Sequence, residues 1–180
     1  IMTFSDTDPT LIVIGSDGTR MSTVVDLGGR RVRSFSVAPD AVQVALVLER
    51  GKTRALGIGL LSRQEGAVHL SHIADIPLSS SDVNLSIITD VAWLSQTRLC
   101  VLGRAIDAGV TTPYEIAVDG SGATSMGQLT ATSMAAVVAL PKETGTEAVV
   151  LSEDGILLRH EDSFRWRQIL QGVSAVAVTA

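Results

Sequence analysis

The sequence predicts an all-β protein: a β-propeller of about four blades of four antiparallel strands, or a fragment of a larger propeller. Three observations carry this prediction. Short apolar strands alternate with glycine-rich turns, no segment has a helical period longer than one turn, and a strand-turn-strand unit recurs. The unit is clearest at residues 33–48, where a Pro39-Asp40 turn joins two apolar strands, and it returns at residues 91–102 and 136–151.

Each unit begins with this pair of strands and continues with two more. In the first complete unit we expect strands at residues 34–38, 42–48, 55–61 and 68–76. The units begin near residues 34, 90 and 136, and are therefore about 56 and 46 residues apart. Four short strands at such a period are typical of propeller blades. A β-sandwich is the alternative, and the repetition of the whole unit favours the propeller.

We expect a single domain over residues 1–180, with blade units at about residues 1–29, 30–78, 85–130 and 133–171. The first unit has room for only two or three strands. A closing strand at residues 173–178 is therefore expected to supply the innermost strand of the first blade and to pair the two ends of the chain. The alternative is that further blades precede Ile1, and that the chain is the C-terminal part of a longer protein.

Composition excludes several classes of function. The net charge is −5 with no basic run, and only 3% of residues are aromatic, which argues against a nucleic-acid partner. No apolar run approaches the roughly 18 residues that a membrane-spanning helix needs. The single cysteine, Cys100, lies among Leu99, Val101 and Leu102, and we expect it to be a buried, inert thiol.

No motif indicates an active site, a cofactor site or a metal site. His69 and His72 are expected on opposite faces of a strand, and His160 lies far from both. Residues 16–19, Ser-Asp-Gly-Thr, resemble the Asp-box turns of sialidase propellers but lack their spacing and tryptophan, so we interpret them as a hairpin turn. Residues 120–122 form a turn and not a nucleophile elbow. We therefore assign no catalytic, cofactor-binding or metal-binding residue.

Two further groups of side chains are notable. Trp93, expected in an inner strand, and Trp166, expected in an outer one, are both predicted to pack in the core or between blades. Arg30, Arg31 and Arg33 form a basic cluster. This cluster could meet an acidic partner surface, and the simpler interpretation is a solvated turn.

Three segments, at residues 31–49, 90–104 and 113–122, carry a family resemblance. They include Ser-Phe-Ser-Val-Ala-Pro-Asp, Asp-Val-Ala-Trp-Leu and Val-Asp-Gly-Ser-Gly. In this order the set resembles the propeller domain of the LpqB lipoproteins of actinobacteria. One departure is Ala41, which stands where the family usually has a glycine after the Pro-Asp pair.

The resemblance implies a non-enzymatic, extracytoplasmic domain, attached to the cell membrane by an N-terminal lipid anchor outside this chain. It implies a protein-interaction module that modulates the MtrA–MtrB two-component system through the extracytoplasmic part of the sensor kinase MtrB, with no cofactor. The longest loops, residues 77–84 and 104–112, are the candidate contact surfaces. The alternative is a propeller that binds a small ligand or a cell-wall fragment in its central channel, although the inner strands are mostly small and apolar.

Overall fold

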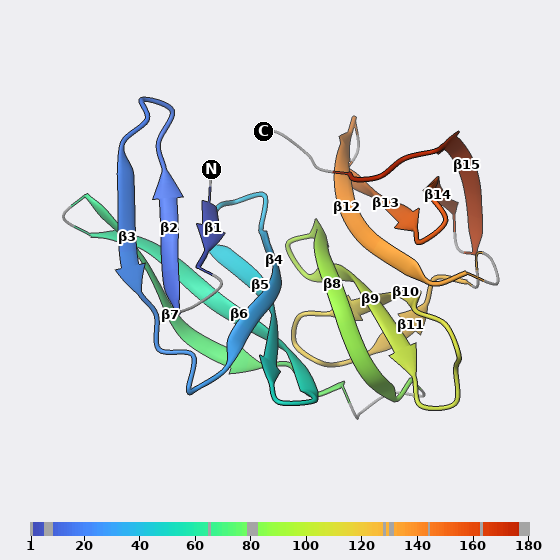
Figure 1. Cartoon of the computed structure of the whole chain (residues 1–180), viewed down its shortest axis with the longest axis horizontal. Coiled ribbons are helices and arrows are strands. Elements are labelled where there is room, and N and C mark those ends of the chain that lie inside the picture. The colour runs from blue at the N-terminus through green and yellow to red at the C-terminus, as the bar shows by residue number, and fades with distance from the viewer. Residues whose placement is uncertain are drawn as a thin grey trace.

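In the computed structural model, the described residues are 2–5, 9–64, 66–78, 83–127, 129, 132–143, 145–162 and 164–176. They form fifteen β-strands in four antiparallel sheets, so the predicted all-β propeller is confirmed. The sheets follow one another along the chain and stand around an arc (Figure 1). Within this described part, no helix is long and apolar enough to cross a membrane.

The sheets differ in the number of their strands. The first has three strands, β1 (Met2–Phe4), β2 (Thr10–Ile14) and β3 (Arg20–Val24). The second contains β4 (Arg31–Val37), β5 (Gln43–Arg50), β6 (Thr53–Gln64) and β7 (Ala67–Asp75). The third contains β8 (Leu85–Ser95), β9 (Arg98–Ala105), β10 (Thr112–Ala117) and β11 (Ala123–Ser125). The fourth contains β12 (Met134–Lys142), β13 (Gly145–Ser152), β14 (Ile156–Asp162) and β15 (Arg165–Gln171).

The second strands of the second and third sheets, β5 and β9, are apolar on both faces because each face packs against another sheet. In β5, Val44, Leu46 and Leu48 belong to the core shared with the first sheet. The alternate residues Ala45 and Val47 belong to the core shared with the third sheet. A strand buried on both faces has a continuous apolar sequence, which explains the central segment of the repeated unit.

Three apolar cores join successive sheets: first to second, second to third, and third to fourth. Among the described residues, no such core joins the fourth sheet to the first. The four sheets therefore form an open arc, with β4, β8 and β12 as the inner strands (Figure 1). Each inner strand has a bulge, where one residue lacks a direct partner in the second strand of its sheet: Arg33 in β4, Thr89 in β8 and Ala135 in β12. β8 has two further register shifts, at Ser86 and Leu94.

The closing strand expected at residues 173–178 is not observed: residues 173–176 belong to no strand, and residues 177 and 178 lie outside the described part. Gly172 turns the chain with a φ of 77°, and the Val173 amide then donates to the carbonyl of Gly155 at 3.0 Å. The chain after β15 is thus held against the β13–β14 turn of its own sheet. The apolar pattern alone could not reveal this local hydrogen bond.

The Pro-Asp turn explains why a glycine would suit position 41. Ala41 donates its amide to the carbonyl of Ala38 at 2.9 Å, and the Asp40 carboxylate accepts from the amide of Val42 at 2.9 Å. This geometry gives Ala41 a φ of 57°, in the left-handed region. The Cβ of alanine makes that region unfavourable, whereas glycine adopts it freely.

We expect Ala41→Gly to raise the free energy of unfolding by about 1 kcal/mol, because it removes the steric cost of a left-handed alanine. Urea denaturation followed by circular dichroism measures the change. Ala74→Gly, at an exposed position of β7 outside the left-handed region, is the matched control. The control should lower stability, because glycine adds unfolded-state entropy without relieving strain. Equal effects of the two substitutions would contradict this explanation.

Candidate interaction surface

The histidines lie apart in the structure. Among the described residues, no group of three or more His, Cys, Asp or Glu side chains could hold a metal ion. His72 is exposed and has a φ of 52° within a bulge of β7, so the regular strand assumed from the sequence is interrupted between it and His69. The His160 ring packs against Trp166 with ring centroids 4.9 Å apart and ring planes tilted by 55°. The bulge was missed because a strand with one extra residue has the same composition as a regular one.

The predicted hairpin turn and the predicted buried thiol are both confirmed. In the turn at residues 16–19, Asp17 accepts hydrogen bonds from the amide and the hydroxyl of Thr19. Both bonds lower the pKa of the Asp17 carboxyl, and the bond from the Thr19 hydroxyl has the larger effect. Cys100 is fully buried, its thiol lies 3.6 Å from the sulfur of Met126, and burial raises the pKa of the thiol far above its ordinary value. A thiol in this state is a poor nucleophile.

Both tryptophans pack between sheets, as predicted. Trp93 on the inner strand β8 is only 2% exposed, and its indole N–H donates to the carbonyl of Ser36 on β4 at 2.8 Å. The indole N–H of Trp166, on the outer strand β15, donates to the carbonyl of Met126 at 2.7 Å. Both residues belong to the core between the third and fourth sheets. Each indole therefore fills an interface between neighbouring sheets and also fixes its register by a hydrogen bond.

Asp90 links three inner strands at the position that follows the bulge at Thr89 in β8. Its carboxylate accepts hydrogen bonds from the hydroxyl of Ser34 on β4 and from the amide of Val137 on β12, the latter at 2.8 Å. It also accepts from the amide of Val91 at 3.0 Å. Burial raises the pKa of Asp90, and the hydrogen bond from Ser34 opposes this shift. Asp90 is thus a structural link between the second, third and fourth sheets.

The predicted basic cluster is solvated, but only Arg30 lies in the turn before β4. Arg31 and Arg33 belong to β4, and both pair with the carboxylate of Glu49 on β5, at 3.2 Å each. Arg54 on β6 donates to the same carboxylate from its Nε at 3.0 Å. The Glu49 side chain is only 10% exposed. The hydrogen bond from Arg54, together with the charges of Arg33, Arg54 and Arg31, holds the pKa of Glu49 below its ordinary value.

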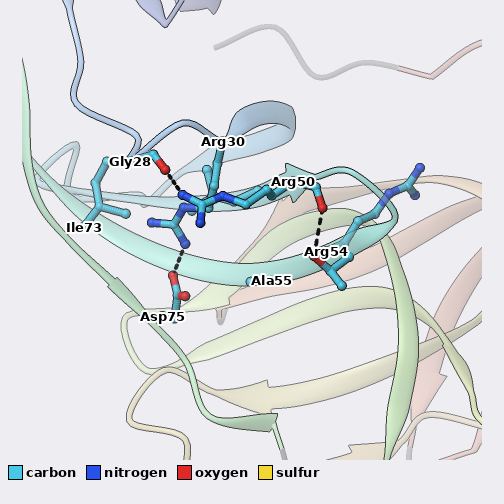
Figure 2. Close-up of a pocket in the computed structure, with 9 residues that line it drawn as sticks. Gly28, Arg30, Arg50, Arg54, Ala55, Ile73 and Asp75 are labelled. Atoms are coloured by element: carbon cyan, nitrogen blue, oxygen red, sulfur yellow. Dashed lines mark hydrogen bonds and ion pairs between the residues drawn. The ribbon is translucent and has the colours of Figure 1, made fainter.

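A groove of about 570 Å³ lies on one side of this cluster, in the second sheet. Arg30 pairs with Asp75, and Arg50 donates to the carbonyl of Gly28 (Figure 2). In the same view, the guanidinium of Arg54 points away from these two arginines. The charges of Arg30 and Asp75 cancel, and the guanidinium of Arg50 is engaged by the backbone.

A second groove, of about 400 Å³, lies between the second and third sheets and also includes Arg54. Lys52, in the β5–β6 turn, lies on the side of the second sheet. Thr89 on β8, Arg104 on β9 and Thr111 of the following loop lie on the side of the third. The predicted contact loop at residues 104–112 therefore borders a real groove. In the other predicted contact loop, 77–84, residues 79–82 lie outside the described part.

The sequence pattern identifies the arginines of β4, but it does not identify Glu49 and Arg54, with which they form one ionic cluster. The Pro-Asp turn sets the register of β4 against β5 as far as Ser34, which pairs with Val47. The bulge at Arg33 then shifts the register by one residue and places Arg31 opposite Glu49, so the turn alone would not have predicted this pair. Arg104 and Lys52 line the same groove because of how the second and third sheets pack side by side. No local sequence pattern encodes this packing.

These features define a β-propeller domain with charged grooves at and between its blades. Residues 6–177 match the model of the family described as the lipoprotein LpqB beta-propeller domain, and the chain belongs to this family.

Individual relatives are consistent with this assignment. The chain is 30% identical over 146 residues to lipoprotein LpqB of Streptomyces coelicolor, and 29% identical over 141 residues to lipoprotein LpqB of Streptomyces avermitilis. These matches cover 81% and 78% of this chain and 23% of each relative, so the chain spans about a quarter of their length.

The fold also resembles a solved structure. The crystal structure of the major Malassezia sympodialis allergen Mala s 1 matches with a TM-score of 0.54 at 8% identity, covering 89% of this chain and 72% of that one. At that identity the likeness concerns the fold alone.

Proposed function

We propose that this domain is a non-enzymatic, extracytoplasmic interaction module that modulates the MtrA–MtrB two-component system by binding the extracytoplasmic part of the sensor kinase MtrB. The observation that carries the proposal is membership of the LpqB propeller family over residues 6–177. The Streptomyces relatives are named lipoproteins, and a lipid anchor would hold the domain beside the outer part of a membrane kinase. Binding modulates the kinase only where the domain prefers one of the kinase's conformations.

The loop at residues 104–112 supports a protein contact on this side of the molecule. Ile106 at its tip is 60% exposed, and the groove beside it carries Arg104 and Lys52. Exposed apolar side chains next to arginines are common at protein interfaces, where the apolar group is buried and the charges set orientation. The alternative of a ligand in the central channel has less support, because the inner-strand carboxylate of Asp90 already accepts bonds from three donors of the protein itself.

The test is a calorimetric titration of this chain into the purified extracytoplasmic domain of MtrB, with an unrelated propeller as the negative control. We expect saturable binding, and a loss of about tenfold in affinity for Ile106→Ser because a buried apolar anchor is worth about 1–2 kcal/mol. Ile169→Ser is the matched control, because Ile169 is 40% exposed on β15 of the fourth sheet. It should leave the affinity unchanged.

Absence of binding both by this folded chain and by a full-length lipoprotein containing it would refute the proposed partner. Binding by the full-length protein alone would place the contact in its other domains. Equal losses for Ile106→Ser and Ile169→Ser would refute the proposed face and leave the partner supported.

A further inference from the structure

Basic side chains are concentrated at one place in an acidic protein. The chain has a net charge of −5 and 14 Lys and Arg residues. In the described structure, seven of these line the two grooves or contact Glu49: Arg30, Arg31, Arg33, Arg50, Lys52, Arg54 and Arg104. Only two carboxylates, Glu49 and Asp75, pair with them among the described residues. The surface around the second groove therefore carries a positive potential that opposes the charge of the whole protein.

The guanidinium of Arg54 is held in a fixed orientation. Its Nε donates to Glu49 at 3.0 Å, and its Nη1 donates to the carbonyl of Ile88 on β8 at 3.1 Å. The Arg54 side chain is 24% exposed, and its Nη2 has no partner among the described residues. An arginine fixed by two bonds loses little rotamer entropy when a third group binds, which is the condition for a preorganised anion site.

Two cations on opposite sides of the second groove, Lys52 on the second sheet and Arg104 on the third, have no acidic partner among the described residues. The side chains of Lys52 and Arg104 make no hydrogen bond or ion pair with any residue that the structure describes. Asp107, three residues beyond Arg104, is exposed and is not among the residues that line the groove. Glu49 also lines the groove and pairs there with Arg54. Arg31 and Arg33 pair with the same carboxylate from outside the lining, so its single charge is more than compensated.

We propose that this second groove, between the second and third sheets, binds a phosphate group, with Lys52, Arg54 and Arg104 as the charged contacts. A phosphate has three or four acceptor oxygens directed to different sides, and it can therefore accept from cations on both sheets at once. Thr89 and Thr111 add hydroxyl groups to the same lining. At about 400 Å³ the groove is larger than one phosphate, so it has room for the sugar or glycerol of a phosphate ester. The proposal is independent of the kinase partner.

Nuclear magnetic resonance of the ¹⁵N-labelled chain, titrated with sodium phosphate at constant ionic strength, tests the site. We expect saturable shifts confined to the amides of residues 51–54, 88–89 and 104–111. Lys52→Ala and Arg104→Gln should each weaken binding about fivefold, the loss expected for one partly exposed charge contact. Sodium chloride at the same ionic strength should produce no saturable shift.

Arg63→Gln is the matched control. Arg63 is exposed near the far end of β6, about 30 Å along the strand from Arg54, and its removal changes the net charge by the same amount. If Arg63→Gln weakens phosphate binding as much as Arg104→Gln, the effect is one of net charge and the site is refuted. Absence of saturable shifts with phosphate would refute it as well.

Vesicle sedimentation distinguishes the source of the phosphate. Binding to phosphatidylglycerol vesicles but not to phosphatidylcholine vesicles, lost in Lys52→Ala and Arg104→Gln and kept in Arg63→Gln, would support the site and identify a lipid headgroup. Saturable phosphate binding without vesicle binding would support the site and identify a soluble or polymeric phosphate ester. Vesicle binding that is unaffected by Lys52→Ala and Arg104→Gln would contradict the assignment of the headgroup to this groove.

Discussion

Trp93→Ala is expected to lower the free energy of unfolding by about 4 kcal/mol, because truncating a fully packed indole leaves a large cavity. The side chain lies in the core between the second and third sheets, together with Val47 and Leu99. The same substitution removes the hydrogen bond to the carbonyl of Ser36. An effect of this size would unfold a marginally stable domain, since such domains have only about 5–15 kcal/mol in total.

Guanidinium denaturation followed by far-ultraviolet circular dichroism measures this loss. Trp93→Phe is the informative companion, because it keeps most of the apolar volume and loses the N–H donor. We expect it to cost about 1–2 kcal/mol, mainly from the carbonyl of Ser36 left without its partner. A loss below about 1 kcal/mol for Trp93→Ala would show that the interface collapses around the cavity.

Asp90→Ala is expected to cost about 2 kcal/mol, because it leaves the buried amide of Val137 without an acceptor. The bond that Ser34 donates across to β8 is lost at the same time. Part of the loss is offset, because the substitution also removes a carboxylate whose charge is disfavoured by burial. Asp90→Asn keeps one carbonyl acceptor and should cost less.

The pH dependence of stability provides a second measurement of Asp90. Its pKa is raised in the folded protein, so above its ordinary value of 3.8 the folded state retains a proton that the unfolded state has released. The contribution of Asp90 to stability is therefore present in full below pH 3.8 and declines as the pH rises through the folded pKa. The difference in unfolding free energy between the wild type and Asp90→Asn should decline over the same range.

Glu49 and Asp17 have lowered pKa values and change stability in the opposite direction. Their contributions are present above the ordinary pKa of a carboxyl group and are lost as the pH falls. Subtracting the Asp90→Asn profile from that of the wild type removes these terms, because both proteins contain them. A difference that grows as the pH rises would contradict the raised pKa of Asp90.

The sequence predicted those parts of the fold in which each residue is constrained by its neighbours in the chain. The strand β5 is recognisable because Val44, Leu46 and Leu48 alternate with Ala45 and Val47, and every one of them is buried. The turn at Asp17-Gly18 is recognisable because its side chain and backbone together favour it. The strand β1 (Met2–Phe4) was not specified, since three residues are too few to show a period.

The candidate surface was predicted less completely, because it is assembled from different blades. The length of the loop at residues 104–112 predicts a contact surface there, but the groove beside it forms only because the third sheet packs against the second. Arg54 had no distinguishing sequence context, although it contacts Glu49 and the carbonyl of Ile88. Interactions between sheets depend on the arrangement of whole sheets, and a local pattern does not contain that information.

The open arc has a consequence for the order in which the molecule unfolds. The second and third sheets each share cores with two neighbours, whereas in the described structure the first and fourth share a core with only one. In such linear arrays, stability is approximately a sum of the units and of their nearest-neighbour interfaces. The end sheets therefore open first, and amide hydrogens of β1–β3 and β14–β15 exchange with solvent sooner than those of β5 and β9. Whatever binds across two sheets in the middle of the array acts on the part of the molecule that opens last.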